Sequence, residues 1–169
     1  MQGAEIPKVS VVTPFWNAER FMRQTLDSVL SQTYQDFEYI CVDDCSQDRT
    51  WEILEEYATK YPQKIKIFKN RFVDGKKNEI AFNLAFAQTR GDFVQSVDHD
   101  DQISEDYLEK CLFRADQVQC DAVVPDCIVY DNETGKVTHA SCGFKGQYGV
   151  ILSNREAVAQ SLDWTIHGF

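Results

Sequence analysis

Apolar, β-branched runs alternate with amphipathic stretches along the first two thirds of this sequence. Strands are predicted at residues 8–16, 37–44, 64–70 and 92–98, and helices at 17–34, 46–62, 76–91 and 104–119. This alternation predicts a parallel sheet with right-handed crossovers, which is a layered α/β fold. The third run, KIKIFKN, alternates cleanly between apolar and polar residues and suits an edge or half-exposed strand.

The pattern changes after residue 118. Residues 121–140 predict one or two antiparallel strands with a turn at DNETG, and residues 153–162 predict a short capped helix. No Gly/Ser-rich linker divides the 169 residues, so we expect a single domain spanning 1–169.

Charge and cysteine content narrow the partners and the compartment. The formal net charge of −10 argues against a nucleic-acid polymer, because phosphate backbones bind basic surfaces. The six cysteines are scattered and form no C-x-x-C motif, which favours free thiols in a reducing compartment over disulfides. The chain has neither an apolar signal region nor a stretch long enough to span a membrane, so we expect a cytoplasmic protein.

Polar groups follow three of the four predicted strands. The strand ends read TPFWN, VDDCS and VDHDD. Ligands of open parallel sheets bind beyond the carboxyl ends of the strands, so these groups are expected to converge on one edge. Asp98, Asp100 and Asp101 place three carboxylates within four positions, and their repulsion costs energy unless they share a cation. Lys76 and Lys77 could be their partners, but a divalent ion fits better. Oxygen-only donors predict Mg²⁺ or Mn²⁺.

Each of these features also has a purely structural interpretation. Asp43 and Asp44 could begin a turn, and Trp16 alone would more often be a core aromatic. The segment 98–109 matches the oxygen positions of a calcium-binding EF-hand loop, but Ile103 replaces the required glycine and a strand precedes it. Zinc-hydrolase, serine-hydrolase and P-loop motifs are absent from the sequence.

Three passages in this order carry a family resemblance. They are VSVVTPFWN, LDSVLSQTYQDFEYICVDDCSQDRT and AFNLAFAQTRGDFVQSVDHDD. Together they resemble the nucleotide-sugar domain of family 2 glycosyltransferases, which has the layered α/β/α, Rossmann-like GT-A fold. The resemblance runs from about residue 8 to residue 121, so it implies a donor half at 8–121 and the start of an acceptor half at 122–169.

The resemblance implies roles for matching residues in a nucleotide-sugar donor site. Pro14 and Trp16 would line the base pocket, with Trp16 against uracil, and Asp44 would accept the imide N–H of the base. Asp98 and Asp100 form the D-x-D motif, which would touch the ribose and hold Mn²⁺ or Mg²⁺ on the two phosphates. Asp101 would lie beside them as a further metal ligand.

The activity implied is inverting transfer of a sugar from a nucleotide diphosphate, most simply a UDP-sugar, to a glycan or lipid-linked acceptor. Such enzymes make cell-surface polysaccharides and often work at the inner face of the plasma membrane, so peripheral membrane association through segments outside this sequence is also implied. Two alternatives stay open from the residues: a sugar nucleotidyltransferase and a non-catalytic nucleotide-sugar-binding module. The first usually begins with a Gly-rich phosphate loop, which TPFWNAERF lacks.

The sequence departs from the family pattern in three places. Relatives read A-R-N-x-G where this chain has AFNLA, so the expected arginine is missing, and Lys76 or Lys77 is the candidate for its positive charge. Cys45 stands where a small residue is usual. The acidic pair that supplies the general base in relatives does not occur, and Asp163, the nearest carboxylate, comes early for that role.

The last of these departures suggests a chain truncated at its C-terminus. Apolar residues accumulate from residue 150 to Phe169, which predicts a surface for self-association, such as a homodimer.

Overall fold

The computed structural model describes residues 6–73, 76–77, 80–125, 127–130, 134, 136–140 and 150–152. The chain divides into two compact units, residues 1–107 and 108–169. The first unit contains β1 (Val9–Phe15), α1 (Met22–Leu30), β2 (Phe37–Asp43), α2 (Thr50–Lys60), β3 (Ile65–Lys69), β4 (Phe72–Val73), β5 (Lys76–Lys77), α3 (Ala81–Phe86) and β6 (Phe93–Ser96). α4 (Tyr107–Val118) begins at the last residue of this unit, and β7 (Ala122–Val124), β8 (Cys127–Tyr130), β9 (Val137–Ala140) and β10 (Val150–Leu152) follow.

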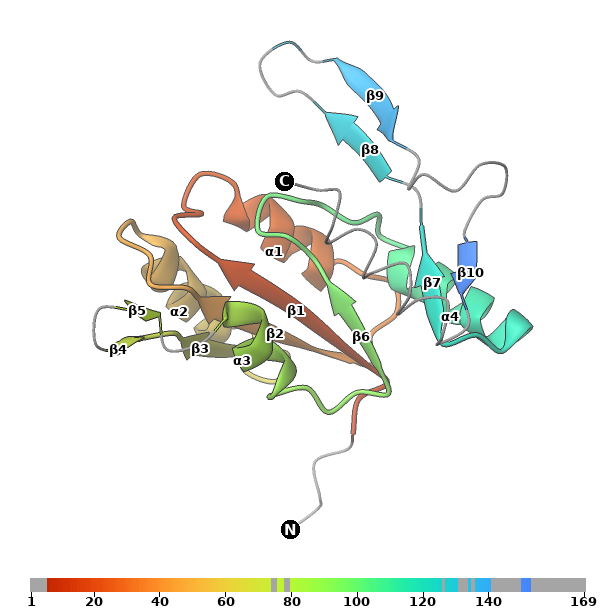
Figure 1. The fold of residues 1–169 in the computed structure, drawn as a ribbon, viewed down its shortest axis with the longest axis horizontal. Coiled ribbons are helices and arrows are strands. Elements are labelled where there is room, and N and C mark those ends of the chain that lie inside the picture. The colour runs from red at the N-terminus through yellow and green to blue at the C-terminus, as the bar shows by residue number, and fades with distance from the viewer. Residues whose placement is uncertain are drawn as a thin grey trace. The chain divides into compact units, whose positions relative to one another are not determined.

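A four-stranded parallel sheet in the order β3-β2-β1-β6 forms the centre of the first unit (Figure 1). β1 pairs with β2 from Val9–Phe37 to Phe15–Asp43, and with β6 from Val9–Phe93 to Val12–Ser96. Every residue of β2, and every residue of β1 except Pro14, is buried, which explains their nearly continuous apolar runs. The predicted α/β fold with a mostly parallel sheet is confirmed, and β3 lies at the edge as predicted.

Helices cover both faces of this sheet, with α1 and α2 on one face and α3 on the other (Figure 1). The connections from β1 to β2 and from β2 to β3 step across the sheet in one direction, and the connection from β3 to β6 steps back. Right-handed crossovers therefore place α3 opposite the first two helices. The core on the α3 face consists of Val12, Ile40, Val42, Ala81 and Ala85. These layers form the predicted α/β/α arrangement.

The third helix is shorter than predicted. The sequence pattern favoured a helix over 76–91, but α3 covers only Ala81–Phe86, and Lys76 and Lys77 form β5 paired with β4. Two-residue strands are too short to leave a periodic signal in a sequence. Gly91 does not end the helix, because it lies five residues beyond it. A Cβ at Gly91 would come within 2.7 Å of the β1 backbone, so close packing requires the glycine there.

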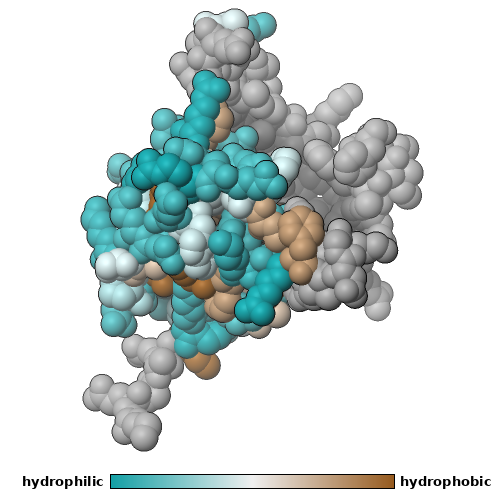
Figure 2. Space-filling view, turned by 90° about the vertical axis from the view of Figure 1, so that its left-hand side faces the viewer, coloured by the Kyte–Doolittle hydropathy of each residue, from teal (hydrophilic) through white to brown (hydrophobic). Residues whose placement is uncertain are grey.

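The surface on the side of α2 and β3 is mostly polar. Figure 2 shows this side, where hydrophilic side chains cover most of the described surface and a small hydrophobic area lies among them. A polar surface agrees with the edge position of β3, whose central residues are only partly buried.

The second unit contains two antiparallel strand pairs among its described residues. β10 pairs with β7, and β8 pairs with β9. The predicted antiparallel addition at 121–140 therefore occurs. The predicted helix at 153–162 and the apolar segment beyond it lie outside the described residues. No described helix has the length and apolarity needed to cross a membrane.

Candidate functional site

The three polar strand ends lie at the same edge of the sheet. Because β2, β1 and β6 are parallel neighbours, their carboxyl ends point the same way. Trp16 directly follows β1, Asp44 directly follows β2, and Asp98 comes two residues after β6. The placement expected from the sequence is therefore observed.

Asn17 links the loop after β1 to the loop after β2. Its backbone has a φ of 47°, and its N–H donates to Ser46 Oγ at 3.0 Å. In return, the N–H of Gln47 donates to Asn17 Oδ1 at 2.8 Å. Asn17, the first residue of the predicted helix at 17–34, does not cap α1, because the helix begins at Met22 and its first turn has no side-chain cap. Asparagine favours both helix caps and left-handed turns. Here its hydrogen bonds with the loop after β2 favour the left-handed conformation.

Asp48 closes the same pair of loops from the other side. Its Oδ2 accepts the N–H of Glu19 at 3.0 Å and its Oδ1 accepts the N–H of Thr50 at 3.0 Å. Burial raises the pKa of Asp48, but the hydrogen bonds from Thr50 and Glu19 outweigh it and the pKa is lowered overall. Thr50 is the first residue of α2, so Asp48 satisfies one of the unpaired N–H groups at the start of this helix. The loops after β1 and β2 are thus held together by hydrogen bonds from both sides.

The two consecutive aspartates after β2 have different surroundings. Asp43 is fully buried, its Oδ1 accepts the N–H of Ser46 at 3.1 Å, and its Oδ2 lies 3.8 Å from Lys69 Nζ. Asp44 is half-buried, and its Oδ1 accepts a hydrogen bond from Asn70 Nδ2 at 2.8 Å. The structural interpretation therefore fits Asp43, whereas Asp44 lies where a ligand can reach it.

Cys45 has a φ of 65°, in the left-handed region. This region is unfavourable for residues with a Cβ and favourable for glycine. The backbone conformation therefore favours glycine at this position, a preference that the sequence alone did not explain.

The acidic segment after β6 is a turn fixed to α1. The N–H of Asp101 donates to the carbonyl of Asp98 at 3.1 Å, and the hydroxyl of the fully buried Thr25 donates to the carbonyl of His99 at 2.9 Å. Asp98, Asp100 and Asp101 are exposed. Partial desolvation raises the pKa of Asp101 although its side chain is exposed, and the neighbouring charges of Asp98 and Asp100 raise this pKa further. The electrostatic crowding inferred from the sequence therefore exists in the fold.

Among the residues that the structure describes, no three His, Cys, Asp or Glu side chains are arranged to hold a metal ion together. A complete three-carboxylate site is thus not preformed. Mg²⁺, however, usually takes one or two protein carboxylates and completes its shell with waters and substrate phosphates. The exposed carboxylates of Asp98 and Asp100 suit such a site by their chemistry.

The other predicted site residues lie after β1, within β1 and β5, and outside the described residues. Trp16 is 56% exposed, so the alternative that it is a core aromatic is wrong. Pro14 lies in β1, half-buried and opposite Val42. Lys77 lies in β5, where the structure describes the backbone only, and Asp163 lies outside the described residues.

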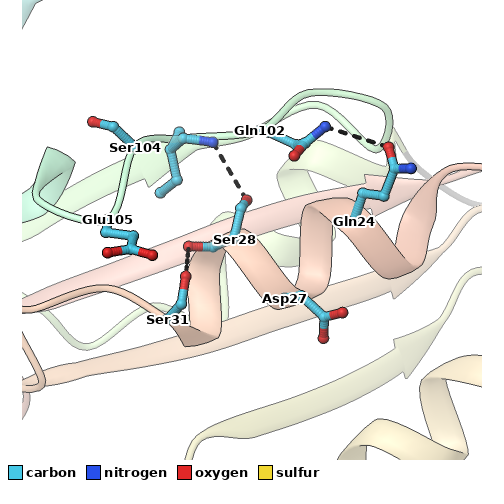
Figure 3. Close-up of a pocket in the computed structure, with 8 residues that line it drawn as sticks. Gln24, Asp27, Ser28, Ser31, Gln102, Ser104 and Glu105 are labelled. Carbon is cyan, nitrogen blue, oxygen red and sulfur yellow. Dashed lines mark hydrogen bonds between the residues drawn. The ribbon is translucent and has the colours of Figure 1, made fainter.

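A polar groove of about 450 Å³ lies on the outer side of α1 (Figure 3). Gln24, Asp27, Ser28, Ser31, Gln102, Ile103, Ser104 and Glu105 line it. Several of its polar groups bond to one another: Ser28 Oγ accepts the N–H of Ile103 at 3.3 Å, and Gln102 Nε2 donates to Gln24 Oε1 at 3.3 Å. These hydrogen bonds attach the segment after the acidic turn to α1, and the groove lies along this contact. No predicted site residue lines it.

Sequence reasoning missed two residues that support the site. Thr25 holds the acidic turn, and Asn70 contacts Asp44. Their only signal is a polar side chain at a position where the surrounding pattern favours burial.

Comparison with known proteins identifies the family. The sequence model described as Glycosyl transferase family 2 matches residues 10–167. The chain belongs to this family. An uncharacterized glycosyltransferase of Bacillus subtilis, EpsJ, is 34% identical over 134 residues, which are 79% of this chain and 37% of EpsJ. The poly(ribitol-phosphate) beta-N-acetylglucosaminyltransferase TarS of Staphylococcus aureus is 33% identical over 69% of this chain and 20% of TarS.

Solved structures support the same assignment. Residues 1–349 of S. aureus TarS in complex with UDP superpose with a TM-score of 0.66 at 30% identity, over 82% of this chain and 40% of that chain. A mannosyltransferase of Pyrobaculum calidifontis shares the fold, with a TM-score of 0.61 at 23% identity, over 75% of this chain and 36% of that chain. The fold is therefore GT-A, as predicted. This family 2 chain spans less than half the length of these relatives.

Proposed function

We propose that this chain contains the donor site of an inverting glycosyltransferase, which moves a sugar from a UDP-sugar to a glycan or lipid-linked acceptor during polysaccharide synthesis. The observation that carries the proposal is the convergence of Trp16, Asp44 and the acidic turn at one edge of a GT-A sheet. The TarS structures support UDP, because one contains UDP and another, at 28% identity, contains UDP-GlcNAc. Both a hexose and an N-acetylhexosamine suit this proposal.

Each side chain at this edge would contact a different part of the nucleotide-sugar donor. Trp16 offers an exposed aromatic face to the base beside Pro14, and Asp44 accepts an N–H of the base. Asp98 and Asp100 would hold Mn²⁺ or Mg²⁺, with Asp101 adjacent, and Lys77 would approach the diphosphate. A bound divalent ion supplies charge neutralisation of the leaving diphosphate.

The acceptor side begins in residues 122–169 in this proposal, following the donor half at 8–121. Inverting transfer needs a carboxylate that deprotonates the acceptor hydroxyl, and Asp163 is the candidate within this chain. Action at the cytoplasmic face of a membrane and self-association as a homodimer are parts of the same proposal. A transfer assay with UDP-sugars and the Asp163→Asn variant tests the base, and full activity of that variant would exclude it.

Calorimetric titration of UDP with and without Mn²⁺ tests the donor site. We expect Mn²⁺ to strengthen UDP binding to the wild type, and Asp100→Asn to lose this dependence while its thermal unfolding is unchanged. Asp92→Asn is the matched control, because Asp92 is an exposed aspartate that precedes β6, pairs with Lys8 at 2.9 Å and lies at the opposite end of that strand. Failure of the wild type to bind UDP, or identical metal dependence in both variants, would refute the proposed site.

A further inference from the structure

We propose that Asn70 is a positioning residue that makes Asp44 selective for bases with a ring N–H, such as uracil, against cytosine. The inference rests on the proposed nucleotide site and deepens it, because it names what determines the base. Neither the family resemblance nor the comparisons assign a role to Asn70.

Asn70 is held firmly in the fold. It directly follows β3, is only 4% exposed, and its N–H donates to the carbonyl of Asp43 at 2.8 Å. Its side-chain Oδ1 accepts the N–H of Arg71 at 2.9 Å, and its Nδ2 donates to Asp44 Oδ1 at 2.8 Å. Burying a carboxamide is unfavourable unless its groups are bonded, and here both ends are bonded.

The orientation of this carboxamide follows from its two partners. A backbone N–H can only donate, so the atom that faces Arg71 must be the oxygen of Asn70. The NH₂ group must then face Asp44, whose carboxylate oxygen can accept. The hydrogen-bond network therefore fixes Asn70 as a donor to Asp44, and a reversed amide would place two acceptors together.

A second contact fixes the backbone of Asp44. Its N–H donates to the carbonyl of Phe15 at 2.7 Å, which ties the end of β2 to the end of β1, next to Trp16. With its backbone fixed and one carboxylate oxygen held by Asn70, the orientation of the Asp44 carboxylate is restricted. It is presented as an acceptor of restricted direction at the same sheet edge as Trp16.

An acceptor of fixed direction discriminates between the pyrimidine bases. Uracil carries an N–H at ring position 3, whereas the same position of cytosine carries a lone pair that a carboxylate repels. A site that is built to hydrogen-bond one group rejects an analogue that lacks it, because the buried polar group is then left unpaired. Without Asn70, the carboxylate would be free to rotate, and this preference would weaken.

Calorimetric titrations of UDP and CDP in the presence of Mn²⁺ test the inference. We expect the wild type to bind UDP at least about tenfold more tightly than CDP. Asn70→Ala should weaken UDP binding about tenfold and leave CDP binding nearly unchanged, so the ratio of the two affinities collapses. Gln63→Ala is the matched control, since it removes an exposed carboxamide near the opposite end of β3, and it should keep the wild-type ratio.

A second variant and the use of two nucleotides distinguish failure of this inference from failure of the proposed function. If Asn70→Ala does not fold, Asn70→Ser is the substitute, because its hydroxyl can still accept from Arg71 but is too short to reach Asp44, and the same collapse is expected. An equal loss of UDP and CDP binding, or an unchanged ratio, would overturn the inference and leave Asn70 a structural residue. Equal binding of UDP and CDP by the wild type would also overturn it while leaving a nucleotide site, whereas binding of neither would refute the proposed function itself.

Discussion

Replacement of Glu38 by glutamine is expected to destabilise the sheet substantially. Glu38 lies in β2 with a side chain only 4% exposed, yet it carries a charge. Its Oε1 accepts from Ser10 Oγ at 2.8 Å and from the N–H of Arg90 at 2.9 Å, and its Oε2 accepts from Lys66 Nζ at 2.7 Å. Arg90 also donates through its guanidinium at 2.9 Å and 3.0 Å. One carboxylate thus joins β1, β3 and the segment that leads into β6.

The size of the effect follows from these contacts. Breaking a buried ion pair by removing one partner costs about 3–5 kcal/mol. The side chains of Lys66 and Arg90 are 41% and 40% exposed, so water can replace part of the interactions with Glu38 that they lose. We therefore expect Glu38→Gln to lower the free energy of unfolding by about 2–3 kcal/mol, since it keeps the shape and some hydrogen bonds. For a chain of this size this corresponds to a fall in Tm of roughly 5–10 °C.

The same substitution has a characteristic pH dependence. Burial raises the pKa of Glu38, but hydrogen bonds from Lys66, Ser10 and Arg90 outweigh it, so the pKa in the folded state is lowered. A lowered pKa means that the ionised form contributes its full stabilisation above the unfolded value of about 4.3, and loses it as the pH falls through the folded value. The stability difference between wild type and Glu38→Gln should therefore narrow below about pH 4.

Urea unfolding followed by circular dichroism, at pH 7 and in steps to pH 3, measures this difference. Glu56→Gln is the control, because Glu56 forms a comparable two-point ion pair with Arg23 at 2.9 Å and 2.6 Å, but on the surface. Exposed pairs contribute little, so this variant should unfold nearly as the wild type does. Equal destabilisation by both substitutions, or a gap for Glu38→Gln that is as large at pH 3 as at pH 7, would refute the reasoning.

Three further outcomes follow from the structure. Gly91→Ala should lower the free energy of unfolding by about 1–3 kcal/mol in urea titrations, because its Cβ would lie 2.7 Å from the β1 backbone, and an unchanged midpoint would contradict this contact. Burial raises the pKa of the free thiol of Cys41, so in peptide mapping iodoacetamide should modify Cys120 in the folded protein and Cys41 only after unfolding. Thr25→Val removes the hydrogen bond to the carbonyl of His99 and should weaken Mn²⁺-dependent UDP titration several-fold; wild-type affinity would show that this anchor is dispensable.

The parallel sheet could be predicted because its central strands are buried on both faces. β1 and β2 are therefore mostly apolar, with buried polar exceptions at Ser10, Thr13 and Glu38, and exposed polar residues begin where the strands leave the core. Those same boundaries gave the positions of Trp16, Asp44 and Asp98 at one edge. The burial of these strands and the position of the residues that follow them are encoded in the same sequence pattern, so both could be predicted. The role of these residues in binding a nucleotide-sugar stays a prediction.

The missed features depend on contacts between distant segments. Asn17 has equal local reason to cap a helix or to form a left-handed turn, and only the loop after β2, about thirty residues away, decides between them. Asn70 similarly looks like the ordinary polar end of an edge strand until Asp44 is placed beside it. The hairpin of β4 and β5 was missed for another reason, since a strand of two residues is too short to show an alternation of apolar and polar residues.

Charge links nucleotide and metal binding at the proposed site. The chain has a net charge of −10, and the acidic turn adds three carboxylates beside the place proposed for a diphosphate. Two unit charges 4 Å apart repel by about 4 kcal/mol at the effective dielectric constant of a protein surface, so an anionic ligand needs a cation between itself and this turn. The factor by which Mn²⁺ raises UDP affinity must then equal the factor by which UDP raises Mn²⁺ affinity, because coupling between two ligands is reciprocal. Titrations in both orders on the wild type and on Asp100→Asn measure this coupling, and a wild type without coupling would place the diphosphate away from the acidic turn.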